Sequence, residues 1–473
     1  MTRRQESETL SEVMVLQLVR PSLGLILLGL LSWPPVWAAQ PEADRLWRVG
    51  EGAFRDGLWE VARRHLERLN DTFPDDAHRP QALFLLGKTG LALGDGEKAL
   101  HAFRQARTLD PTLNGSEAVT FWEAEALFKL RRFEEARDTY LASAMASPPG
   151  EFVAEALYGA AWSEMESGRQ QDAIVLFRQL LQSHPTHPLA GTATLDLARE
   201  YLARQQWNSA ATLLRPFPGT FPQHPKLAEA RYLLALADLK RGVREAALTG
   251  FERFLTLHPR DPLAAEARLL LARELATQGK GKEALGHYRA FVRDFPENPL
   301  LPRALLEEGT LARKLSQPKE ASTAWQRLVA MAPADPLARQ AALELATLAL
   351  KEARYTQALY WAEKARLAQE RDVREEAWLI EGEAYLRLGQ PQAAVDVFKV
   401  VLKGGAKNPR YYRALARSGV AEEALGAREK AVANYQEVVA GAKDPELVRW
   451  ARDRLKQVKV PTKPVSPSKG KPS

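Results

Sequence analysis

Residues 80–113 read PQALFLLGKTGLALGDGEKALHAFRQARTLDPTL, and this stretch decides the fold. Its first half places Leu83, Leu86 and Gly87 on one helical face, and Gly94 follows where that helix should end. The second half repeats the pattern with small and aromatic residues at spacings of four and three, until a proline stops it. Such spacings form the apolar stripe of an amphipathic helix, and Gly and Pro commonly follow helix ends. The stretch therefore predicts two helices joined by a glycine turn.

The same unit returns along the chain at a nearly constant period. An alanine that opens the second helix recurs every 37 residues, with one step of 36, at Ala62, Ala99, Ala136, Ala173, Ala210, Ala247, Ala284, Ala321, Ala358, Ala394 and Ala431. Twelve residues before each alanine is a position that we call the small column, which holds Gly50, Gly87, Ala124, Ala161, Ala198, Ala235, Ala272, Gly309, Ala346, Gly382 and Gly419. Such small side chains allow two helices to approach closely.

A third column carries large side chains four residues after each helix-opening alanine. We call it the knob column, and it holds Leu66, Phe103, Tyr140, Phe177, Leu214, Phe251, Tyr288, Trp325, Phe398 and Tyr435. Repeat nine departs from it with Ala362. A proline also ends eight of the units in phase. Columns that share one period predict an internal repeat along nearly the whole chain.

This pattern resembles the tetratricopeptide repeat, a helix–turn–helix unit with small, aromatic and proline signature positions. Repeat ten carries the fullest version, with Trp378, Gly382 and Tyr385 followed by Gly389 at the turn. The resemblance covers about residues 43–445 and implies an all-α, right-handed solenoid of about eleven repeats. The period exceeds the family's usual 34 residues. The extra residues fall in Pro-x-x-Pro connectors between repeats.

The repeats are not equally regular. Pro216 falls inside the expected second helix of repeat five, where a proline removes a hydrogen-bond donor and should cut the helix short. Repeat nine lacks its aromatic knob, has Glu370 in place of the connector proline, and precedes the 36-residue step. We therefore expect weak seams near 216–222 and 366–374, and we divide the array into residues 43–227 and 228–445.

The C-terminal end predicts a cap and a tail. Residues 446–458 present Val448, Ala451 and Leu455 on one face, which predicts a capping helix over the last repeat. Residues 459–473 are rich in Pro, Ser and Lys and lack apolar bulk, so we expect a disordered basic tail. Such a tail either keeps the chain soluble or touches a membrane or the cell wall.

Composition excludes several classes of function. The chain has 66 basic and 59 acidic residues, a net charge of +7, and no cysteine. Disulfides, thiolate metal sites and a lipid-modified N-terminal cysteine are therefore excluded. The tail alone contributes +4, so about +3 remains for the rest, too little to argue for nucleic-acid binding.

No catalytic or cofactor motif stands out. Residues 87–89 end like a phosphate-binding loop, but Ala82 occupies the required glycine position and the segment lies within a helix. Histidines recur in the connectors at the repeat spacing, yet no carboxylate or thiolate recurs with them, so we expect no metal site. We predict no cofactor and no enzyme activity.

Polar positions of the first helix are the better candidates, because in the family that helix lines the concave groove. Directly after the small column, Trp162, Arg199 and Arg273 are candidate partner-binding residues. Five residues after the small column, Lys314, Lys351 and Arg387 fall in consecutive repeats and predict a basic stripe along the groove. The alternative is that these cations only stabilise helix C-termini through the helix dipole.

We therefore expect a non-catalytic scaffold that binds envelope proteins or peptides. The connectors FPQHPKLAEARYLLA and FPENPLLPRALLE resemble those of Tol–Pal cell-division coordinators and of outer-membrane assembly proteins. That resemblance implies a role in envelope assembly or cell division in a bacterial periplasm. A scaffold for polysaccharide export or peptidoglycan synthesis is the alternative, and an accessory subunit of a cell-wall enzyme is a more distant one.

Residues 22–33 form an apolar run that follows Arg20 and precedes the small residues Val36 and Ala38. The run is short for a membrane span of roughly twenty residues, so residues 1–38 read as a signal peptide. The alternative is an uncleaved membrane anchor. We predict that the mature chain begins at Ala39, which N-terminal sequencing of protein from the envelope fraction will show. Recovery of residues 1–38 intact would contradict cleavage.

Overall fold

The computed structural model describes residues 42–113, 117–146 and 150–458, and every regular element in these ranges is a helix. The predicted signal peptide, residues 1–38, and the predicted basic tail, residues 459–473, lie outside the described residues. None of the helices in the described ranges has both the length and the apolarity needed to cross a bilayer.

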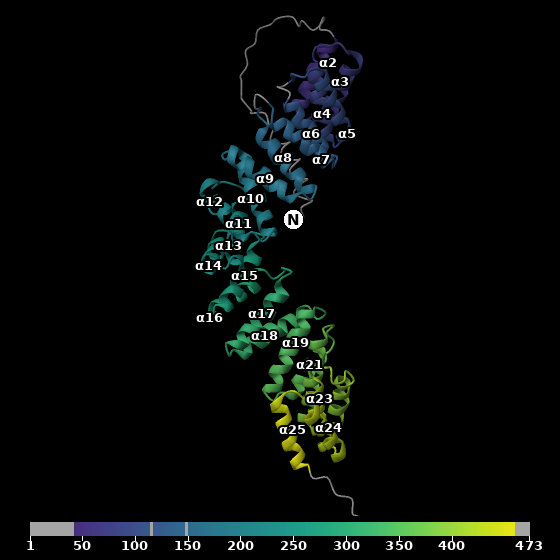
Figure 1. The fold of residues 1–473 in the computed structure, drawn as a ribbon, viewed down its shortest axis with the longest axis vertical. Helices are drawn as coiled ribbons and strands as arrows, with labels where there is room; N and C mark the ends of the chain where they lie inside the picture. The colour runs from purple at the N-terminus through teal and green to yellow at the C-terminus, as the bar shows by residue number, and fades with distance from the viewer. Residues whose placement is uncertain (1–41, 114–116, 147–149, 459–473) are drawn as a thin grey trace, which may run out of the picture. The chain divides into compact units, whose positions relative to one another are not determined.

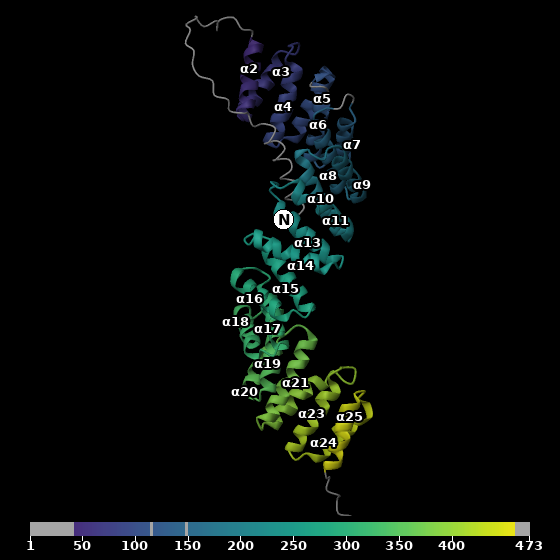
Figure 2. The same cartoon turned by 90° about the vertical axis from the view of Figure 1, so that its left-hand side faces the viewer.

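The helices follow one another in pairs, as Figures 1 and 2 show. The first part of the chain contains α2 (Glu42–Arg55), α3 (Trp59–Thr72), α4 (Arg79–Leu93), α5 (Gly96–Leu109), α6 (Glu117–Lys129), α7 (Phe133–Ala144), α8 (Val153–Glu166), α9 (Gln170–Ser183), α10 (Pro188–Ala203), α11 (Trp207–Leu214), α12 (Phe217–Thr220) and α13 (Leu227–Lys240). The second part contains α14 (Arg244–Leu257), α15 (Ala264–Thr277), α16 (Gly281–Asp294), α17 (Leu301–Lys314), α18 (Pro318–Met331), α19 (Pro336–Lys351), α20 (Tyr355–Ala365), α21 (Arg371–Arg387), α22 (Pro391–Leu402), α23 (Tyr411–Ala424), α24 (Arg428–Gly441) and α25 (Pro445–Gln457).

The chain divides into two compact units between Ala247 and Leu248, within α14. Unit 1 precedes this point and unit 2 follows it, whereas the sequence placed the division near residue 227. In each repeat we call the first helix A and the second helix B. In unit 2, successive helices A contact one another, namely α17, α19, α21 and α23. The all-α fold of helix–turn–helix repeats is therefore confirmed.

The contact between the small and knob columns holds each repeat together. All eleven helix-opening alanines are 0% exposed. A Cβ added to Gly309 would lie 2.4 Å from Nε1 of the knob Trp325, and one added to Gly382 would lie 2.3 Å from the ring of Phe398. The knob side chain thus rests directly on the backbone of helix A. At these two glycine positions an added Cβ would therefore displace the knob ring.

A further column joins each repeat to the one before it. We call it the interface column; it lies five residues before the small column and holds Ala82, Val119, Ala156, Ala193, Ala230, Ala267, Ala304, Ala341, Ala377 and Ala414. Each of these is at most 1% exposed. Ala82 belongs to the apolar cluster of repeat one, with Leu66 and Leu69, and Ala414 belongs to that of repeat ten. Small side chains here let neighbouring repeats stack closely.

The turn between helices A and B has the same backbone conformation in every repeat. The residue seven after the small column has a positive φ each time, with Gly at seven positions and Arg131, Gln205, Ser316 and Ala353 at the other four. This left-handed conformation favours glycine because other L-residues are strained in it. The helix ends expected at Gly94 and Gly389 follow from this requirement.

The two irregular repeats differ from the others as their sequences indicate. In repeat five, α11 ends at Leu214, and the short helix α12 begins directly after Pro216. In repeat nine, Ala362 faces Ala346 in a small cluster completed by Ile380. A ring is therefore missing where the other repeats place a large knob.

The helix α25 closes unit 2. Ala451 lies one repeat after Ala414, in the interface column, and packs fully buried with Tyr435 and Val438 of repeat eleven. Lys456 then falls in the small column, where it is exposed and pairs with Asp453. A lysine in this column cannot accept a closely packed helix B. The helix α25 thus packs on repeat eleven as a helix A does, through Ala451, while Lys456 makes its other side a polar surface.

We predict that Gly309→Ala destabilises the chain by about 1–3 kcal/mol, because its Cβ would overlap Trp325 in a packed core. The matched control is Gly286→Ala in α16, where an added Cβ meets nothing within 4 Å. The control should stabilise by about 0.5–1 kcal/mol through helix propensity. Thermal and urea unfolding of the full chain measure both. Equal effects of the two substitutions would show that the small column carries no packing constraint.

Repeat three buries an acid at the position directly after the small column. Glu125 is only 8% exposed, and the hydroxyl of the knob Tyr140 donates a hydrogen bond to its carboxylate. Burial raises the pKa of Glu125 to about 7, although the hydrogen bond from Tyr140 and the charge of Lys129 oppose this. The carboxyl group therefore changes charge near neutral pH in the folded chain.

We predict that repeat three loses stability as the pH rises from about 4.5 to about 7, because the unfolded state releases the Glu125 proton first. Below this window both states hold the proton, and above it both have lost it. The pKa difference corresponds to roughly 3 kcal/mol. Hydrogen exchange of α6 and α7 amides measures this stability at each pH, and Glu125→Gln should remove the loss. Parallel pH profiles for the variant and the natural chain would refute the assignment.

Candidate functional site

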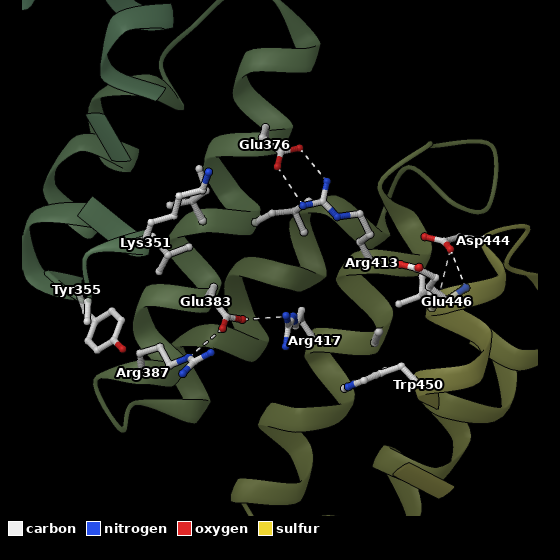
Figure 3. A pocket seen from close by; sticks show the side chains of 16 residues that line it. Lys351, Tyr355, Glu376, Glu383, Arg387, Arg413, Arg417, Asp444, Glu446 and Trp450 are labelled. Carbon is white, nitrogen blue, oxygen red and sulfur yellow. Dashed lines mark hydrogen bonds and ion pairs between the residues drawn. The ribbon is translucent and has the colours of Figure 1, made fainter. Parts of the chain in front are cut away.

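Unit 2 contains a hollow of about 680 Å³ on the face formed by its helices A. Its walls come from α19, α21, α23 and α25, with Tyr355 at the start of α20 (Figure 3). We call it the C-terminal hollow. Lys351 and Arg387, two residues of the predicted basic stripe, both line it.

The repeat period explains why these walls meet. Glu376, Arg413 and Trp450 are each one 37-residue repeat apart, on α21, α23 and α25. Residues one period apart occupy the same position on neighbouring helices of a solenoid, so they lie side by side. The sequence therefore places an acid, a base and an aromatic ring in one row across the hollow.

Glu376 forms one anchor of this row. It accepts two hydrogen bonds from Arg413, both at 3.1 Å, and one from Arg410 at 3.0 Å. Burial alone would raise the pKa of Glu376, but the hydrogen bonds and charges of Arg413 and Arg410 hold it below its usual value. Glu376 is therefore ionised at neutral pH and shared by two guanidinium groups.

Glu383 forms the second anchor. Figure 3 shows it between Arg387 and Arg417, at 3.0 Å from Arg387 Nε and 3.3 Å from Arg417 Nε. The carboxylate side chain is only 13% exposed, whereas those of Arg387 and Arg417 are 56% and 47% exposed. The acid thus lies below the surface and the two cations lie above it. What the hollow presents to an approaching molecule at this point is positive charge.

Apolar residues form the floor between the charged groups. Leu350, Leu379, Ile380 and Leu447 line the hollow together with Trp450. The Trp450 ring meets the knob Tyr435 edge-on, with ring centroids 5.6 Å apart, and the Arg417 guanidinium lies 5.9 Å from the Trp450 ring centroid. The tryptophan is therefore held in place by packing, and one of its neighbours is a cation.

Lys351 differs from the arginines of the hollow. It is exposed at the end of α19 and makes no hydrogen bond or ion pair with the described residues. The acids Asp444 and Glu446 stand at the opposite wall, where Asp444 caps α25 by accepting hydrogen bonds from the backbone N–H groups of Glu446 and Leu447. The wall at Lys351 thus carries a positive charge available to an external anion.

The other candidate residues lie elsewhere. Lys314 is exposed at the end of α17 and does not line the C-terminal hollow. Arg199, in unit 1, pairs with Asp196 and Glu229, both at 2.6 Å.

Arg273, in unit 2, forms a bidentate pair with Glu307 at 2.6 and 2.7 Å. Trp162, in unit 1, is 6% exposed and belongs to the apolar cluster around Phe177. The side chains of Arg199, Arg273 and Trp162 therefore hold neighbouring helices of the chain itself. Sequence could not separate such roles from partner binding, because it does not show which acid lies opposite each column.

Sequence reasoning did not single out Arg413, Arg417 or Trp450. The sequence does contain a signal for Arg413 and Trp450, because they lie one and two 37-residue periods after Glu376. Arg417 has no such signal. It enters the site only because α23 packs beside α21 and brings it within reach of Glu383.

The described residues contain no group of three or more His, Asp or Glu side chains arranged to hold a metal ion. The histidines of the connectors have local roles instead. The ring of His187 accepts a hydrogen bond from the backbone N–H of Leu189, and that of His224 accepts one from Lys226. These bonds fix the entry to the next helix A.

Comparison with solved structures returns helical repeat proteins of low identity. A C-terminal part of a tetratricopeptide-repeat protein from Cytophaga hutchinsonii is 15% identical, covers 55% of this chain and 98% of its own, and has a TM-score of 0.45. A tetratricopeptide-repeat protein from Parabacteroides merdae is 16% identical over 57% of this chain and 98% of its own, with a TM-score of 0.35. Yeast Tom70 is 13% identical over 88% and 95%, with a TM-score of 0.32. No curated protein matches the sequence.

Two family profiles match the sequence. A profile described as outer membrane lipoprotein, YfiO, matches residues 151–299. The tetratricopeptide repeat profile matches residues 50–114, 306–373 and 379–446, where the small and knob columns pack against each other. The chain therefore contains tetratricopeptide repeats in these three segments.

Proposed function

We propose that this chain is a non-catalytic scaffold of the bacterial cell envelope that binds an acidic segment of a partner protein in the C-terminal hollow. The observation that carries the proposal is that the arginines of the hollow are more exposed than the acids with which they pair. Glu376 and Glu383 are mostly buried, and each pairs with two guanidinium groups. The arginine side chains at the surface of the hollow are about half exposed, namely those of Arg387, Arg413 and Arg417.

The apolar floor supports a peptide as the ligand. A segment that places a carboxylate between Lys351 and Arg387 can also set an apolar side chain on Leu379, Ile380 and Trp450. A buried apolar anchor surrounded by polar contacts is the usual arrangement of a binding hot spot. The charges steer and orient the segment, and the anchor slows its dissociation.

The envelope part of the proposal rests on sequence. The match of residues 151–299 to an outer membrane lipoprotein family and the signal-like run at 22–33 both favour export. A role in outer-membrane assembly or in cell division of the Tol–Pal type fits this location. A scaffold for polysaccharide export or peptidoglycan synthesis fits it too, and the identity of the captured partner separates these alternatives.

We predict that replacing Lys351, Arg387 and Arg413 together by Gln weakens partner capture by roughly tenfold, because all three line the hollow and exposed ion pairs each contribute a fraction of a kcal/mol to about 1 kcal/mol. Capture by the natural chain should also weaken as salt rises from 0.05 to about 0.5 M. Quantitative pull-down from envelope extract measures both. A photo-crosslinking residue at position 351 should yield a crosslinked peptide with net negative charge.

The matched control replaces Lys282, Lys403 and Lys407 by Gln, which removes the same charge from exposed positions of unit 2 outside the hollow. It should capture partners as the natural chain does. If both triple variants recover the same partners at the same salt, the three cations of the hollow do not contact the partner. The hollow would then not be the binding site.

A further inference from the structure

The first repeat breaks the interface column. In every later repeat this position is Ala or Val and is at most 1% exposed, because it packs into the core of the preceding repeat. In repeat one the same position holds Arg45, whose side chain is 67% exposed. No repeat precedes α2 among the described residues, so the outer face of α2 and α3 is an end face of unit 1.

This end face contains a hollow of about 490 Å³, which we call the N-terminal hollow. Its lining consists of Arg45, Leu46 and Val49 from α2, and Arg64, His65 and Arg68 from α3. No acid lines it. Glu42 lies at its rim, where its carboxylate pairs with Arg68 and lies 3.9 Å from Arg45.

A requirement for solubility alone does not explain this composition. A terminal repeat needs a polar outer face, but charges of both signs satisfy that need. The other end of the array, α25, shows the mixed case: Lys456 pairs with Asp453 at 2.9 Å, and Arg454 pairs with Glu423 of α23. The N-terminal hollow differs in the proportion of charges: one carboxylate, Glu42, stands against three guanidinium groups, and these lie beside Val49, which is 40% exposed.

The chain before α2 indicates what such a face meets. Eight residues separate the apolar run at 22–33 from Glu42, so a fully extended connector spans at most about 30 Å. A signal segment of this kind holds α2 within this distance of a membrane for as long as it stays attached. Guanidinium groups around an apolar patch suit the boundary between lipid phosphates and acyl chains.

We propose that the outer face of α2 and α3 binds an anionic phospholipid bilayer. In this arrangement Arg45, Arg64 and Arg68 contact lipid phosphates, and Val49 meets the apolar edge of the headgroup layer. The groove formed by the helices A stays free to bind protein. This inference is independent of the acidic-segment site in unit 2.

Vesicle sedimentation tests the proposal. The full chain, and a chain that begins at Ala39 and keeps every described residue, are mixed with phosphatidylcholine vesicles with or without 30% phosphatidylglycerol. The chain from Ala39 should bind only the anionic vesicles and should be released by about 0.5 M salt. Arg45→Gln, Arg64→Gln and Arg68→Gln together should weaken this binding at least tenfold while circular dichroism shows unchanged helicity.

Two controls separate the end face from other basic regions. The Gln triple at Lys282, Lys403 and Lys407 removes the same charge in unit 2 and should bind like the natural chain. A chain that ends at Val458, without the basic tail, should still bind. The proposal is overturned if the chain from Ala39 does not bind anionic vesicles. It is equally overturned if the Arg triple binds like the natural chain, or if loss of the tail alone abolishes binding.

Discussion

The contact between a small residue of helix A and a large side chain of helix B is the constraint on which this structure depends. The ring of Phe103, Trp325, Phe398 or Tyr435 rests on the backbone of a glycine sixteen residues earlier in the same repeat. This contact fixes the distance and rotation between the two helices. Once they are fixed, the interface column can stack the next pair, and every other position of the repeat acquires a constant orientation.

A constant orientation also decides which charges can neutralise each other. Side chains one period apart lie next to each other, so Arg273 meets Glu307 and Arg413 meets Glu376 across neighbouring helices A. These charges consequently join neighbouring repeats. The proposed binding surface lies where acids and bases are unequal in number, as at Glu383, where one recessed carboxylate pairs with two exposed arginines.

At both ends of the described array, the residues of the interface and small columns decide whether another helix pair can pack there. Ala451 keeps the interface column and lets α25 cover repeat eleven, and Lys456 then makes that helix unsuitable for a further partner. At the other end, Arg45 replaces the interface alanine and leaves the face of α2 in contact with solvent. The substitutions that end a solenoid are thus also the ones that give its ends a distinct chemistry.

The sequence by itself determined the helix pairs, their period, the buried columns and the interruption at Pro216, because these follow from local propensity and from side-chain size repeated along the chain. It also placed Lys351 and Arg387 on one face. Only the tertiary structure decided that the side chains of Arg199, Arg273 and Trp162 contact neighbouring helices of the chain. It alone also decided that Arg417 and Trp450 line the C-terminal hollow. The physical reason is that period and size are properties of single positions, whereas charge pairing and surface shape depend on which side chain stands opposite. That depends on the packing between helices.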